Sequence, residues 1–176
     1  MAWWRERLEE LDEAGAVPAE PRLQAVVDEL LTRAIPGSEL SRLEDGWLAL
    51  LDPFPWGEPQ ADGLKLRGRT LFGIGARLLS QNAGDAEPAG ALWSLVDGAR
   101  HCSDPDSRLF LLAEARRLLW EYPAEPPPKA LRRLTGLAAV AAHDLLRSGT
   151  PELSRGGLGR PAAALVHYLR GTLPRS

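Results

Sequence analysis

Four polar residues, Asp97, Arg100, His101 and Asp104, follow one another at helical spacing within one short stretch of the chain. On an α-helix, offsets of three, four and seven residues place side chains along one ridge. Carboxylates are oxygen ligands that suit Mg²⁺, and an arginine can hold a phosphate through two hydrogen bonds. One interpretation is therefore a diphosphate site, with Asp97 and Asp104 as metal ligands and with Asp97, Arg100 and His101 around the substrate.

The same residues also fit a junction between two helices. Asp104 would then be the N-cap of the second helix, with Pro105 at its first position and Asp106 in its first turn. Arg100 and His101 would complement the negative end of the preceding helix. Spacing alone favours this second interpretation, because polar ridges on helices usually face water and because only capping explains the proline.

Length and composition predict a single domain over residues 1–176. The chain is 44% hydrophobic, enough for one sizeable core, and its single cysteine, Cys102, excludes an internal disulfide and a zinc site built on cysteine pairs. The longest wholly apolar run, Leu137–Ala142, is far shorter than the ~20 residues of a membrane-spanning helix. The N-terminus does not resemble a signal peptide. We expect a cytoplasmic protein.

The net charge of −3 conceals a gradient along the chain. Residues 127–176 carry +6, and the remaining 126 residues carry −9. The basic C-terminal loop and helix, residues 149–176, would suit an anionic membrane surface, phosphates or an acidic partner, or would be an ordinary solvated surface. A nucleic-acid partner is not expected, because aromatic residues do not alternate with these charges.

Helical periodicity extends from end to end, and no stretch alternates with period two for long enough to predict a strand. We therefore expect an all-α helical bundle with a proline-rich loop at residues 52–63 and a stiff break at residues 123–128. Gly73 and Gly75 would let another helix or a ligand approach closely. The expected helices lie before residue 15, from 21 to 36, from 38 to 51, from 64 to 81, from 89 to about 103, from 104 to about 122, from 129 to 147, and from 161 onward.

Three segments carry a resemblance to a known family. Read in order, residues 2–8 (AWWRERL), 92–101 (LWSLVDGARH) and 131–139 (LRRLTGLAA) resemble the squalene/phytoene synthase family, and together they span nearly the whole chain. The resemblance implies a helical bundle like the C-terminal two-thirds of the trans-isoprenyl diphosphate synthase fold. The N-terminal helices that carry the family's first aspartate-rich motif would be missing, and that would expose an apolar surface to a dimer partner or another protein.

The family's second acidic motif, N-x-x-R-D-x-x-E-D, falls on the polar ridge. Its asparagine corresponds to Asp97, its arginine to Arg100, its first aspartate to His101, its glutamate to Asp104 and its last aspartate to Pro105. The arginine is retained and Asp104 is a shortened equivalent of the glutamate. An imidazole and a proline, however, stand where the family has oxygen ligands.

The family works in isoprenoid biosynthesis and joins two prenyl diphosphates head to head with Mg²⁺. Because metal ligands are missing here, the resemblance implies a catalytically degenerate member that binds a prenyl or other lipid or acts as an assembly-type factor. An active prenyltransferase, or part of one, is a first alternative; it would need Mg²⁺, with Arg67, Arg69 or Arg77 assisting at the diphosphate. A helical scaffold that binds only protein is a second alternative.

Overall fold

The computed structural model describes residues 2–13, 17, 19–147 and 158–174. In these residues the fold is all-α, as predicted, and contains no strand. Short 3-10 turns, named η1 to η4, cover residues 31–33, 49–51, 83–85 and 129–131. The helices are α1 (Ala2–Glu10), α2 (Pro21–Glu29), α3 (Gly37–Leu48), α4 (Glu58–Leu78), α5 (Glu87–His101), α6 (Pro105–Trp120), α7 (Arg132–Arg147) and α8 (Gly159–Arg170).

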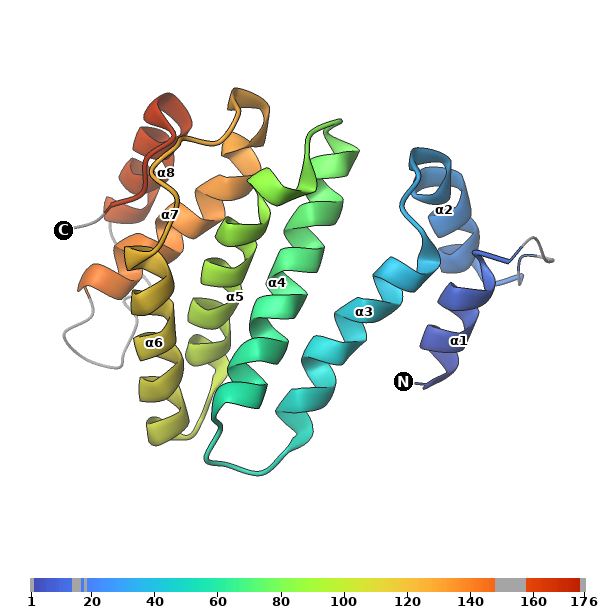
Figure 1. Cartoon of the computed structure of the whole chain (residues 1–176), viewed down its shortest axis with the longest axis horizontal. Helices are drawn as coiled ribbons and strands as arrows, with labels where there is room; N and C mark the ends of the chain where they lie inside the picture. Colours follow the sequence, from blue (N-terminus) through green and yellow to red (C-terminus); the bar gives the residue numbers. More distant parts are fainter. Residues whose placement is uncertain (1, 14–16, 18, 148–157, 175–176) are drawn as a thin grey trace.

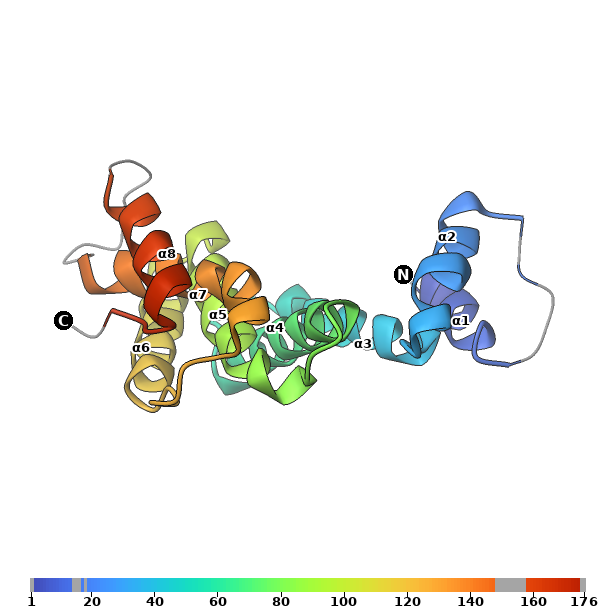
Figure 2. The same cartoon turned by 90° about the horizontal axis from the view of Figure 1, so that it is seen from above.

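The helices form an elongated arrangement in which α3 leads from the N-terminal pair to the main body (Figure 1). Helix α5 packs against α4, α6 and α7, and α8 packs on α7. Figure 2 shows α1 and α2 at the opposite end of the molecule from α6, α7 and α8. Within the described residues, no helix combines the length and the apolar character that crossing a bilayer would require.

The inward side of α5 forms the centre of the hydrophobic core. Leu92, Leu95, Val96 and Ala99 are fully buried, as their helical spacing predicts. Burial of each leucine contributes about 1.5–3 kcal/mol to folding. In α7, the spacing of Leu137, Ala141 and Leu145 predicts that all three point inward; Ala141 and Leu145 are buried, but Leu137 is 47% exposed.

Several element boundaries differ from the sequence-based predictions. Helix α4 begins at Glu58 rather than near residue 64, since Pro59 is tolerated in a first helical turn. Helix α3 begins at Gly37, one residue before the expected cap at Ser38. The carboxylate of Asp12 accepts hydrogen bonds from the backbone N–H groups of Gly37, at 2.6 Å, and Ser38, at 2.9 Å, so it caps α3 from outside that helix.

The last helix was expected from residue 161 and begins instead at Gly159. Most of the basic loop before it, and the predicted end of the first helix near residue 15, lie outside the described residues.

Helices α4 and α5 cross closely at two glycines. A side-chain carbon added at Gly68 would overlap the backbone oxygen of Gly90, and one added at Gly90 would overlap the backbone oxygen of Gly68. Close approach was expected at Gly73 and Gly75, where an added carbon would instead meet Ala83 at 3.4 Å and Leu134 at 3.0 Å. The tightest backbone approach between these helices thus depends on Gly68 and Gly90.

We expect Gly68→Ala to lower the free energy of unfolding by about 2–3 kcal/mol, because the methyl group forces the two helices apart. Gly136→Ala is the matched control, since an added carbon at this helical glycine meets nothing within 4 Å. That control should be neutral or stabilise the protein by up to about 1 kcal/mol. Urea denaturation measures both, and equal stabilities of the two variants would contradict the assigned crossing.

Helix α8 is fixed to α7 through a buried histidine. The ring of His167 is fully buried, and its Nε2 lies 2.8 Å from the hydroxyl of Thr135. Its Nδ1 lies 3.2 Å from the backbone oxygen of Thr172, so Nδ1 carries the proton and Nε2 accepts from the threonine. Burial lowers the pKa of His167 below its usual 6.5, and the nearby Arg132 lowers it further, although the Thr172 carbonyl opposes both.

We expect thermal stability to fall as the pH is lowered from about 7.5 to about 5. In this range His167 becomes protonated in the unfolded chain, whereas in the folded protein its lowered pKa keeps it neutral. The stabilisation is present above the ordinary histidine pKa and is lost as the pH falls through the lower folded value. In His167→Gln, melting temperatures over this range should vary less with pH. An unchanged slope would exclude His167 as the titrating group.

Candidate functional site

A largely apolar pocket of about 640 Å³ opens between α3, η2, α4 and α5. Trp47 and Leu51 are exposed at its rim, while Leu64 is fully buried. The pocket, called the Trp47 pocket below, is lined by Trp47, Leu50, Leu51, Trp56, Leu64, Arg67, Asp97, Gly98 and His101. Its size and composition are typical of ligand sites, which combine apolar walls with a few polar groups.

Three of the predicted site residues, Arg67, Asp97 and His101, form the polar edge of the Trp47 pocket. The guanidinium of Arg67 lies 3.5 Å from the carboxylate of Asp97 and 4.2 Å from the centre of the Trp47 ring. Nδ1 of His101 lies 2.9 Å from the backbone oxygen of Asp97. The edge therefore offers one largely buried cation next to one carboxylate.

The environment of Arg67 leaves its charge incompletely balanced. Burial lowers the pKa of Arg67, and the charge and hydrogen bond of Asp97 only partly offset that effect. The Nε atom of Arg67 is buried without a hydrogen-bond partner. Leaving this buried donor without a hydrogen bond costs stability.

Arg100 lies apart from these three residues and contacts Asp144 of α7. Asp144 is almost fully buried, and it also accepts hydrogen bonds at 2.9 Å from Nε of Arg160 in α8. Burial by itself would raise the pKa of Asp144, but the hydrogen bonds from Arg160 and His143 and the charge of Arg100 lower it overall. This cluster connects α5, α7 and α8.

We expect Arg100→Met to lower the free energy of unfolding by about 2 kcal/mol, because it leaves the buried Asp144 carboxylate less well compensated. Arg116→Met is the control, since Arg116 is exposed on α6 and its loss should change stability by less than about 0.5 kcal/mol. Urea denaturation at neutral pH provides the comparison. If Arg100→Met is as stable as the wild type, the pair with Asp144 is not needed for folding, and Arg100 becomes a candidate for ligand binding.

Asp104 is the N-cap of α6, which confirms the capping interpretation. Its carboxylate accepts hydrogen bonds from the backbone N–H of Ser107, at 2.8 Å, and from the Ser107 hydroxyl, at 2.6 Å. Those two bonds lower the pKa of Asp104. The Ser107 oxygen in turn accepts from the backbone N–H of Trp56 at 2.7 Å, so the cap holds one wall of the Trp47 pocket in place.

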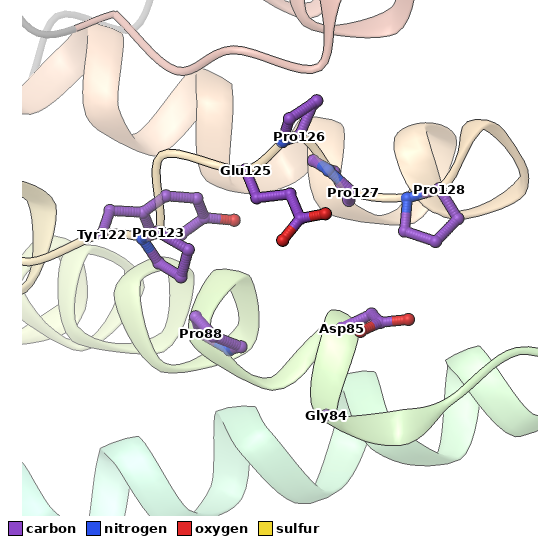
Figure 3. A pocket seen from close by; sticks show the side chains of 9 residues that line it. All are labelled: Gly84, Asp85, Pro88, Tyr122, Pro123, Glu125, Pro126, Pro127 and Pro128. Carbon is purple, nitrogen blue, oxygen red and sulfur yellow. The ribbon is translucent and has the colours of Figure 1, made fainter.

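The other two arginines of α4 point to different surroundings. Arg77 pairs with Glu39 of α3. Arg69 lines a separate cavity of about 360 Å³ near the ends of α5 and α6. Next to it lies a second hollow of about 330 Å³, drawn in Figure 3, where Glu125 of the segment 123–128 points into the space between that segment and the start of α5.

The side chains at the polar ridge do not fit a magnesium site. Asp97 faces the Arg67 guanidinium, and Asp104 is engaged in capping α6. In the part of the chain that the structure describes, no three His, Cys, Asp or Glu side chains gather as metal ligands would. Mg²⁺ favours carboxylates with bound waters and phosphates, so this donor set gives it little to bind.

Two parts of this arrangement were missed by sequence reasoning. The sequence pattern marks Trp47 only as one of the apolar residues of its helix, and it gives no signal that Asp144 pairs with Arg100. The run of prolines around Trp56 is a usable signal, because a stiff loop that carries a tryptophan indicates an apolar surface nearby. Comparison of the chain with protein-family models, curated proteins and solved structures gives no match.

Proposed function

We propose that this protein binds a prenyl chain or a similar lipid in the Trp47 pocket without transforming it, as a degenerate relative of the squalene/phytoene synthases or an assembly-type factor. The observation that carries the proposal is the largely apolar cavity of about 640 Å³ with a single buried guanidinium at its edge. The resemblance noted in the sequence supports the prenyl class. The assignment of a synthase-like fold, which is more specific than all-α, rests on that resemblance.

The apolar walls supply the affinity in this proposal. Burial of a CH₂ group contributes about 0.8 kcal/mol, so a chain of two or three isoprene units gains enough for micromolar binding, which corresponds to about −8 kcal/mol. Trp47 and Leu51 at the rim are accessible to a ligand and would become covered by it. Covering exposed apolar side chains adds to the driving force.

The polar edge selects the head group. Arg67 offers the positive charge of its guanidinium to a hydroxyl, a carboxylate or a single phosphate. A diphosphate would bring several negative charges toward Asp97, with one partly compensated arginine to balance them. A lipid with a neutral or singly charged head is therefore the preferred ligand.

We expect calorimetry to show binding of farnesol without magnesium and weakening by at least about tenfold in Trp47→Ala, which removes a wall of the pocket. Trp3→Ala is a matched control, because Trp3 in α1 is 49% exposed and Trp47 is 50% exposed. Arg67→Met should weaken farnesyl monophosphate more than farnesol, since only the former gains from the positive charge.

The two alternatives predict other outcomes of the same titrations. Tight binding of farnesyl diphosphate that requires Mg²⁺ would support a prenyltransferase or part of one. If none of these ligands binds or raises the melting temperature, the proposal fails and a scaffold that binds only protein is favoured.

A further inference from the structure

Helix α8 carries an apolar stripe on the side that faces solvent. Leu158, just before the helix, is 88% exposed, Leu165 is 58% exposed and Leu169 is 63% exposed. With the exposed Ala162 they stand at offsets of four, seven and eleven residues, which places them along one face of a helix. Val166 is also exposed beside them. A continuous apolar face of this kind indicates an interaction surface.

The contacts on the opposite face of α8 fix this orientation. Arg160 bonds to the buried Asp144, and His167 lies between α8 and Thr135 of α7. At the C-terminal end, Arg132 donates hydrogen bonds to the backbone oxygens of Tyr168, at 3.3 Å, and Leu169, at 2.8 Å. Rotation of α8 to bury the stripe would break all of these interactions, so the stripe remains outside in the folded protein.

Positive charge lies beside the stripe. Among the described residues of α7, α8 and the segment after α8, the only acid is Asp144, which is buried and paired with arginines. Arg170 is exposed at the end of α8, and Arg133 lies over the ring of Tyr168 at 5.9 Å from its centre. An apolar face with cations beside it complements a surface that is apolar inside and negatively charged outside.

We propose that α8 lies flat on the surface of a membrane that contains anionic lipids, with Leu158, Leu165 and Leu169 inserted among the acyl chains. Arg170 and Arg133 would meet the lipid phosphates, and Tyr168 would lie at the level of the head groups. A second copy fits this face less well, because two such surfaces would bring arginines together without an exposed carboxylate between them. The proposal does not depend on occupancy of the Trp47 pocket.

Sedimentation with vesicles tests this proposal on the whole chain. Wild-type protein should sediment with vesicles of phosphatidylcholine and phosphatidylglycerol, and much less with phosphatidylcholine alone. The double variant Leu165→Ser, Leu169→Ser should bind at least about tenfold more weakly. Leu109→Ser is the control, because Leu109 is 53% exposed but belongs to α6. Trp47→Ala should sediment like the wild type, which separates this surface from the pocket.

A second variant and a second measurement keep the test independent of folding defects. Arg170→Glu should reduce binding to the anionic vesicles several-fold, and added salt should reduce binding of the wild type. Wild-type protein that stays in the supernatant, or a double variant that sediments as well as the wild type, would overturn the proposal. It would also fail if light scattering revealed a wild-type dimer that the double variant converts to monomers, since the stripe would then be a subunit interface.

Discussion

The close crossing of α4 and α5 is the constraint on which the candidate site depends. Gly68 and Gly90 have no side chains, so the two backbones approach where any larger residue would overlap a carbonyl oxygen. Arg67 immediately precedes Gly68, and the crossing brings its guanidinium to 3.5 Å from Asp97 on α5. If the helices stood further apart, the cation would lose this partner, and the polar edge of the Trp47 pocket would not form.

Helix α5 divides its polar side chains between two neighbours. Asp97 faces Arg67 of α4, whereas Arg100, one turn later, contacts Asp144 of α7. The ridge that the sequence presents as one unit therefore serves two separate clusters, and Asp104 beyond its end serves a helix cap. Because each charge already has a protein partner, a diphosphate and its metal would have to compete with those partners for the same groups.

Local patterns predicted the helices and most of their inward faces, but the long-range pairs could not be predicted. The periodicity of Leu92, Leu95 and Val96 identified the buried side of α5, and the Asp-Pro pair at residues 104–105 identified the start of α6. These signals depend only on neighbours within one or two turns. Arg100 and Asp144 are 44 residues apart, and their pairing depends on how α5 packs against α7, which no local spacing encodes.

The burial of Asp144 changes how the charge gradient along the chain is interpreted. Asp144, one of two acids in the basic third of the sequence, lies inside the protein with Arg100 and Arg160, so it cannot neutralise the outer surface of α8. The remaining cations near that helix act on the solvent side, next to exposed leucines. Positive charge and apolar surface strengthen binding together only when the partner is both negatively charged and apolar. A small charged ligand is only charged, and an ordinary apolar pocket is only apolar, so neither matches this surface.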